Sequence, residues 1–269
     1  MSSPKMNSVG NIRNKIRIGT SGYHYPDWKH VFYPPELRAS EYLEFYARHF
    51  QAIEINGSYY RIPSLAQMKS LDTRTPPDMA ISIKAFHSFT HGSLDTGEID
   101  AFRSALDPIA DSGKLHALLF QFPFAFHQTP ESWDRITRIN QAFSAYRRVI
   151  EFRHESWIDA DVFARLHTMD LSFCAVDGPS LPKLPGIVSN LTNRLGYIRF
   201  HGRNARQWWE HEKAWERYDY LYSERELSVW KTRIERMADD ADSILVFFNN
   251  HYRGQAVQNA RMLDAFWKD

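Results

Sequence analysis

Polar and charged side chains alternate with large apolar ones in several short segments of this sequence. In an extended strand, residues two apart share a face, so each such segment has one apolar face and one polar face. The polar faces comprise Glu54 with Asn56, Ser82 with Lys84, Gln121, Glu151 with Arg153, and Arg199 with His201. This set combines two carboxylates, three cations and an imidazole, the groups used for acid–base chemistry and for binding anions.

The three cations of this set predict an anionic ligand, because guanidinium and ammonium groups bind the oxygens of phosphates and carboxylates. Glu54 or Glu151 is the predicted general base, and His201 is the predicted general acid. Further contacts to the anion are expected from the side chains of Gln121, Asn249 and Asn250 and the backbone N–H groups of residues 19–22.

Other chemistries find less support in the sequence. A divalent metal held by Glu54, Glu151, His201 and Asp177 would be repelled by the three cations, so we expect no metal. A glycosidase-like carboxylate pair needs one raised pKa, whereas neighbouring cations lower both. Nucleophilic catalysis by Cys174 is disfavoured because this thiol lies inside an apolar segment. The remaining alternative is an ion-pair network with a purely structural role.

The elements that must position these groups are eight short segments rich in β-branched and aromatic residues. Most are separated by helical patterns, and strands alternating with helices imply a parallel sheet. Eight units predict a closed (β/α)8 barrel, the TIM barrel. An open doubly wound sheet is the second choice, since no glycine-rich phosphate loop follows the first segment. The predicted strand segments are 16–21, 52–57, 80–85, 116–122, 148–154, 171–177, 196–202 and 243–250.

Helix starts and irregular connections are also recognisable. Predicted capping residues are Ser64, Thr129 and Ser223, followed by Gln67, Pro130 and Glu226 respectively. Residues 178–190 hold three prolines and no helical period, which predicts an irregular connection after the sixth strand. Residues 203–222 hold three tryptophans and three tyrosines, so we expect a packed flap beside the pocket.

Eight motifs spread over most of the chain resemble the YecE-like family, a domain of unknown function. The resemblance implies a TIM barrel and a soluble bacterial-type protein, and it brings no established activity. The motifs are IRIGTSGYHYPDW, FYARHFQAIEINGSYYRIPS, SIKA followed by TH, LLFQFP, VIEFRHESW, YIRFHGR, YDYLYS and FFNN. The positions that carry over as pocket candidates without roles are Thr20, Ser21, Trp28, Glu54, Asn56, Tyr60, Lys84, Gln121, Glu151, Arg153, Arg199, His201, Asn249 and Asn250.

Composition limits the partners. The chain has 269 residues with 33 Lys and Arg against 32 Asp and Glu, and this near-neutral charge gives no general attraction to nucleic acid or membrane. The single cysteine and the absence of a signal-peptide pattern predict a cytoplasmic protein, and no apolar run predicts a membrane span. We expect a flexible tail over residues 1–14 and one TIM-barrel domain over 15–269.

Three functions remain open at this stage. The first is a metal-independent enzyme that acts on a small substrate bearing phosphate or carboxylate. The second is a nucleic-acid-binding or nucleic-acid-processing barrel, because the same cations and aromatic loops could hold a nucleotide or an extruded base. The third is a non-catalytic sensor of a small ligand. The sequence specifies no cofactor and no oligomeric state.

Overall fold

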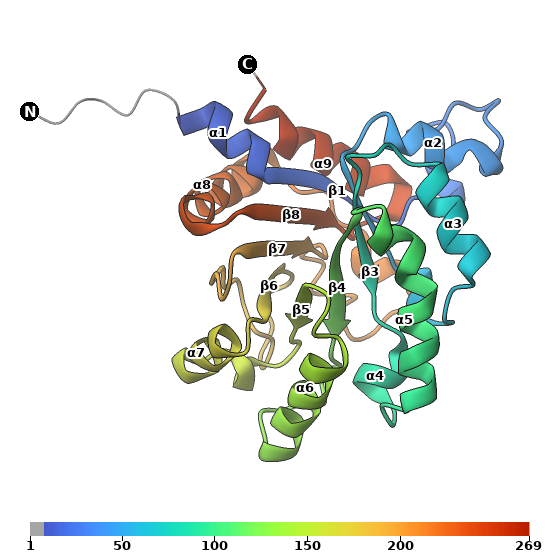
Figure 1. Cartoon of the computed structure of the whole chain (residues 1–269). Coiled ribbons are helices and arrows are strands. Elements are labelled where there is room, and N and C mark those ends of the chain that lie inside the picture. The colour runs from blue at the N-terminus through green and yellow to red at the C-terminus, as the bar shows by residue number, and fades with distance from the viewer. Residues whose placement is uncertain (1–7, 269) are drawn as a thin grey trace, which may run out of the picture.

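Eight parallel strands close into a barrel at the centre of the structure, a computed structural model that describes residues 8–268 (Figure 1). Closure is direct, because β1 pairs with β8 on one side and with β2 on the other. The predicted (β/α)8 barrel is thereby confirmed. The strands are β1 Ile16–Ser21, β2 Ala52–Ile55, β3 Ala80–Lys84, β4 Leu115–Gln121, β5 Arg148–Glu151, β6 Ser172–Asp177, β7 Leu195–Phe200 and β8 Ser243–Phe248.

Helices surround the strands, as Figure 1 shows. The predicted capping boxes form at Ser64 and Ser223, and Thr129 accepts a hydrogen bond from the backbone of Ser132 with Pro130 at the first helical position. The helices are α1 Ser8–Lys15, α2 Tyr42–Ala47, α3 Leu65–Thr73, α4 His87–His91, α5 Thr96–Asp111, α6 Pro130–Ala142, α7 Ala160–Thr168, α8 Glu224–Asp240 and α9 Gln255–Ala265. No helix within residues 8–268 is long and apolar enough to cross a membrane.

The amino-terminal segment differs from the expected tail over residues 1–14. Helix α1 covers residues 8–15 and lies near α8 (Figure 1). Arg13 forms an ion pair of 2.7 Å with Asp264, and Lys15 Nζ donates a hydrogen bond of 2.7 Å to the carbonyl of Ala238. These contacts dock the helix on the barrel, so the expectation of a tail is wrong for residues 8–14. Residues 1–7 lie outside the described part of the chain.

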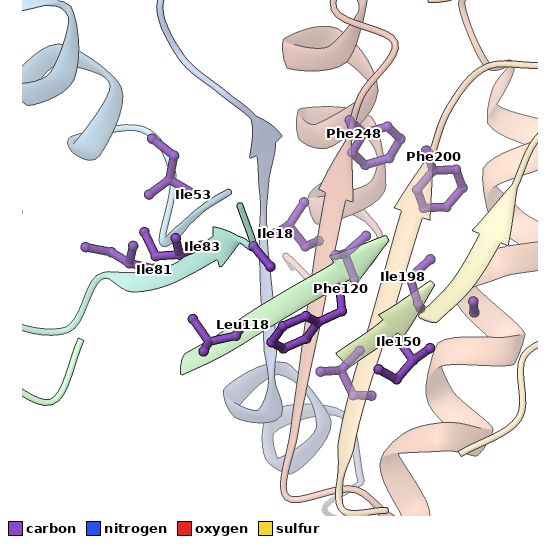
Figure 2. Close-up of a cluster of buried hydrophobic side chains, with 14 of the residues drawn as sticks. Ile18, Ile53, Ile81, Ile83, Leu118, Phe120, Ile150, Ile198, Phe200 and Phe248 are labelled. Atoms are coloured by element: carbon purple, nitrogen blue, oxygen red, sulfur yellow. The ribbon is translucent and has the colours of Figure 1, made fainter. Parts of the chain in front are cut away.

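The outer face of the strands is apolar and packs under the helices. Figure 2 shows this layer, which includes Ile53, Ile150, Ile198 and Phe200. All four are fully buried. Because the side-chain period of a strand is two, burying these residues outward forces their polar neighbours toward the barrel axis. The alternation predicted from the sequence is confirmed.

The inner face has two levels with different chemistry. Its lower level is closed by small and apolar side chains, as in other barrels whose interior is a packed core. Its upper level, near the carboxyl ends of the strands, is polar. The members of the apolar level are Ala52, Ala80, Ala117, Leu119, Val149, Cys174, Leu195, Tyr197, Leu245 and Phe247.

The connection after β6 contains no helix, as the prolines predict. Residues 178–194 run as turns and irregular chain between β6 and β7. The space that a helix would fill is a groove of about 860 Å³ between α7 and α8, lined by Phe163, Val229 and Arg233 among others. This irregular connection also lies close to the barrel mouth, because Pro179 and Gly186 line a small hollow together with Arg153.

The insertion after β7 is packed rather than extended into solvent. Its Trp208 is buried, and its Trp215 stacks on Tyr252 with 3.9 Å between ring centroids. Residues beyond β8 hold its end: Asn259 donates to the carbonyl of Tyr222 and accepts from its N–H group. Only a short 3-10 turn, Glu216–Tyr218, interrupts the irregular chain of residues 203–222.

A buried aspartate fixes the base of this insertion. Asp177 ends β6, is fully buried, and accepts two hydrogen bonds of 2.8 and 2.6 Å from the guanidinium of Arg203. The hydroxyl of Tyr222 and the indole N–H of Trp230 donate to its two oxygens at 2.8 and 2.6 Å. Four donors thus compensate the cost of burying one carboxylate, and they join β6, the insertion and α8.

We expect Asp177→Asn to lower the free energy of unfolding by about 3 kcal/mol, because Arg203 loses its buried partner and the new amide faces donors. The matched control is Asp242→Asn, which removes an exposed ion pair with Arg194 and should lower the free energy of unfolding far less. Urea unfolding measures both. Equal losses in the two variants would show that Asp177 does not anchor the insertion.

Candidate functional site

Arg199 joins two carboxylates on the axis of the barrel. Its NH2 group lies 2.7 Å from Glu54 Oε1, and its NH1 group lies 2.6 Å from Glu151 Oε2. The three side chains come from β7, β2 and β5, and they are 0–1% exposed. The three side chains therefore meet on the barrel axis. Their ion pairs fill the axis, so they form a buried floor and not the walls of an open pocket.

Tyr197 extends this floor toward β3. Its hydroxyl donates a hydrogen bond of 2.7 Å to Glu54 Oε2 and lies 2.7 Å from Ser82 Oγ. Glu54 therefore has one guanidinium and one hydroxyl as partners, which satisfies both of its oxygens. We did not single out Tyr197 from the sequence, although it shares the inward alternation of Arg199 on the same strand.

Arg153 supplies a second cation, which lies above this floor and pairs with it. Its Nε atom lies 2.5 Å from Glu151 Oε1, and its side chain is 14% exposed. Burial by itself would raise the pKa of Glu151, but Arg153 and Arg199 outweigh it and hold that pKa well below its usual value. Glu151 is thus a stable anion, and a carboxylate so strongly paired is a weak base.

His201 lies beside Glu151 and is fully buried. Its Nε2 atom is 3.3 Å from Glu151 Oε1 and 3.1 Å from Arg153 NH2, and its Nδ1 atom is 3.0 Å from the Asn249 amide. Burial and the charge of Arg153 lower the pKa of His201 to about 3. At neutral pH the ring is therefore uncharged, and it holds no imidazolium proton to donate as an acid.

Lys84 stands apart from these ion pairs. Its Nζ atom donates a hydrogen bond of 2.9 Å to Gln121 Oε1 and lies 4.2 Å from the centre of the Tyr59 ring. Burial and the charge of Arg199 lower the pKa of Lys84 to about 7. The sequence could not show Tyr59 as a partner, because it comes from the turn Gly57–Tyr59, which no strand alternation governs.

Two further polar groups at the mouth are buried without partners among the described residues. Ser21 lies opposite Glu54 in the register of β1 and β2, and its Oγ atom makes no hydrogen bond. Asn56 follows Ile55, which pairs with Ile83, so Asn56 and Lys84 occupy the next position on neighbouring strands. The Oδ1 atom of Asn56 also makes no hydrogen bond. Buried polar atoms left in this way mark places where a ligand or water binds.

Four of the pocket candidates lie outside this cluster. Thr20 faces outward and bonds the hydroxyl of Tyr46, while Trp28 is fully buried and donates to the carbonyl of His251. Asn250 faces outward and donates to the carbonyl of Tyr220. Tyr60 is 77% exposed. These residues shape or hold the loops, whereas Asn249 joins the cluster through His201.

Asp177 does not join the two glutamates, since it faces outward to Arg203 and Trp230. Within residues 8–268, no three His, Cys, Asp or Glu side chains are arranged to hold a metal ion. The only cysteine, Cys174, lies 3.7 Å from Glu151 Oε2 and is fully buried. Burial and the charge of Glu151 raise the pKa of this thiol well above its usual value, which makes it a poor nucleophile.

The family described as "Protein of unknown function DUF72" matches residues 17–269. The chain belongs to the DUF72 family. This confirms the resemblance to the YecE-like family, which is the same family. A curated relative, "UPF0759 protein YunF" of Bacillus subtilis, is 27% identical over 271 residues, which cover 92% of this chain and 93% of that protein.

Solved DUF72 structures share the fold. A DUF72 protein of Thermotoga maritima is 33% identical, with a TM-score of 0.88, over 94% of this chain and 99% of that one. A DUF72 protein of Enterococcus faecalis is 26% identical, with a TM-score of 0.84, over 94% of this chain and 96% of that one. The TIM barrel is therefore the fold of the family, and the names of these relatives assign no reaction.

We expect Arg199→Met to lower the free energy of unfolding by about 3 to 5 kcal/mol, because Glu54 loses its cation while both carboxylates stay buried. The matched variant Arg153→Met should cost less, since Glu151 keeps Arg199. Urea unfolding of both variants provides the comparison. If Arg199→Met were as stable as the wild-type protein, the axial ion pairs would not support the fold.

The pKa of Lys84 predicts a pH-dependent stability. Between pH 7 and its ordinary pKa of 10.5, the unfolded chain binds a proton at this residue that the folded protein lacks. The free energy of unfolding of the wild-type protein should therefore rise by about 1.4 kcal/mol per pH unit from this group alone. Lys84→Met removes this pH-dependent contribution. The free energy of unfolding of the wild-type protein minus that of the variant should therefore rise from pH 7 to pH 9.

Urea unfolding at pH 7, 8 and 9 measures this difference. Lys69→Met, on the exposed surface of α3, is the matched control for the loss of a lysine. A difference between wild type and Lys84→Met that stays constant over this range would mean that Lys84 keeps its proton in the folded protein.

Proposed function

We propose that the barrel mouth binds a small anion and that the protein is a metal-independent enzyme acting on a substrate with a phosphate or carboxylate group. The observation that carries this proposal is the convergence of two cationic side chains on one neutral oxygen. Lys84 Nζ lies 2.9 Å and Arg153 NH2 lies 3.5 Å from Gln121 Oε1. An anion is a stronger acceptor for both donors than an amide oxygen is.

The charges at the mouth leave room for one further negative group. Glu54 and Glu151 are matched by Arg199 and Arg153. Lys84 has no carboxylate within 4 Å among the described residues. When Lys84 is protonated the cluster carries one excess positive charge, and a bound anion would balance it. The purely structural alternative accounts for the two arginines but assigns no role to Lys84.

Solvent exposure also separates the ion-paired residues from the residues around them. Glu54, Glu151, Arg199 and His201 are at most 1% exposed, so a ligand entering the mouth does not meet them first. The rim above them is partly exposed and consists of Asn56, Lys84, Gln121 and Arg153. We therefore assign anion binding to this rim, while the buried floor orients Arg153 through Glu151.

Aromatic side chains cover the opposite side of the mouth. Tyr218 of the insertion lies 6.3 Å from the ring of His201, and it contacts His251, which in turn stacks on Tyr25 at 4.4 Å. Such rings limit the access of water, which strengthens charge–charge interactions at the rim. They also offer flat surfaces to a substrate that carries a ring.

Binding of the anion should be coupled to protonation of Lys84. An anion beside the amine raises its pKa above 7, so the protein takes up a proton when the ligand binds near neutral pH. Calorimetry with inorganic phosphate, in buffers of different ionisation enthalpy, measures this uptake. We expect tighter binding at pH 6 than at pH 8. Both Lys84→Met and Arg153→Met should weaken binding about tenfold or more, and only Lys84→Met should abolish the proton uptake.

The matched control is Arg194→Met, because Arg194 forms an exposed ion pair at the opposite end of the barrel. It should bind phosphate as the wild-type protein does. Equal affinity of wild type and both rim variants would refute an anion site here. Binding of an oligonucleotide that strengthens with strand length and falls steeply with salt would instead support the nucleic-acid alternative.

A further inference from the structure

The amine of Lys84 has an environment that differs from that of every ion-paired group around it. Its acceptor is a neutral amide, and an aromatic face lies on its other side. Ser58 Oγ donates a hydrogen bond of 2.6 Å to the backbone carbonyl of Lys84, and this contact holds the turn that carries Tyr59 against the end of β3. The amine thus lies between an amide oxygen and an aromatic ring, and no carboxylate within residues 8–268 pairs with it to retain its proton.

Charged and titratable groups face Lys84 from several elements. Their combined electrostatic effect, together with burial, favours the neutral amine. The carboxylates among them are already paired with guanidinium groups, so their attraction for the amine is largely cancelled. Burial, which disfavours the charged form, then dominates. The groups are Glu54 of β2, Tyr59 of the following turn, His91 of α4, Glu151 of β5, Arg153 after β5, and Arg199 of β7.

Lys114 provides a contrast within the same barrel. It is also buried, but it forms an ion pair of 3.0 Å with Asp72 and donates to the carbonyl of Thr75 at 2.9 Å. Its amine is held by a carboxylate and by backbone oxygens, as expected of a structural lysine. The amine of Lys84 has neither a carboxylate nor a backbone oxygen as a partner among the described residues.

A second observation points to a ligand beside the amine. The Oδ1 atom of Asn56 occupies the neighbouring strand end and has no hydrogen-bond partner, and neither does Ser21 Oγ. A buried amide oxygen without a donor is costly unless a ligand or a water molecule supplies one. A hydroxyl group formed on a carbon next to Lys84 would supply this donor.

We propose that Lys84 is a nucleophile that forms an imine with an aldehyde or ketone bearing a carboxylate or phosphate group. This inference rests on the proposed anion site, because the rim must hold the anionic group of the substrate near Arg153. The anionic group then fixes the carbonyl carbon beside the amine, and this positioning supplies much of the rate advantage.

The reaction balances without an oxidant or a reductant. The lone pair of Nζ forms a C–N bond as the electron pair of the C=O bond moves to oxygen, and one amine proton transfers to that oxygen. The resulting hydroxyl can donate to Asn56 Oδ1. Loss of this oxygen with a second amine proton, as water, leaves the C=N double bond. The products are therefore one imine and one water.

Reductive trapping tests this proposal. The intact protein is incubated at pH 7 with sodium cyanoborohydride and with pyruvate or glyceraldehyde 3-phosphate, and the modified peptide is identified by mass spectrometry. We expect one adduct, on Lys84, in the wild-type protein and in Lys114→Met. Acetone, which has no anionic group, should label Lys84 at least tenfold less. Lys84→Arg removes the nucleophilic amine, so it should form no adduct.

The outcomes separate this inference from the proposed function. Phosphate binding without an adduct on Lys84 would overturn the imine and leave the anion site standing. Loss of both phosphate binding and the adduct would overturn both. Labelling spread over exposed lysines, or equal labelling by acetone, would also overturn it. Circular dichroism of Lys84→Arg excludes unfolding as the cause of a missing adduct.

Discussion

The ion pairs of Arg199 with Glu54 and Glu151 are the interaction on which the upper half of this barrel depends. Two carboxylates on a fully buried axis would be far too costly alone, and Arg199 between them, together with Arg153 on Glu151, compensates both. These ion pairs join β7 to β2 and to β5 across the barrel. It also explains why the inner face changes from apolar at the lower level to polar at the upper level.

The same network explains the unusual state of Lys84. Because the arginines already neutralise the two glutamates, the amine on β3 gains little from them and loses its hydration through burial. A lysine with a pKa near 7 is the kind of group that enzymes use as a base or a nucleophile. The ion-pair network and Lys84 are therefore one system, in which the network lowers the pKa of the amine.

Loops complete the mouth, and the insertion after β7 is fixed to the barrel by buried polar contacts. Asp177 and Asn259 hold the aromatic insertion at its two ends, and this brings Tyr218 beside His201. The connection after β6 has no helix, so its prolines reach the rim near Arg153. The resulting site has a charged rim on one side and an aromatic cover on the other, a combination suited to a small anion with an organic body.

The sequence by itself determined the barrel, its strands, the inward direction of Glu54, Glu151 and Arg199, and the two irregular connections. It could do so because strand alternation, capping residues and prolines act over a few residues. Only the tertiary structure decided which cation pairs with which carboxylate, that His201 is neutral, and that Lys84 bonds an amide and no carboxylate among the described residues. These properties depend on distances between strands that are remote in sequence and on burial, and no local pattern encodes either.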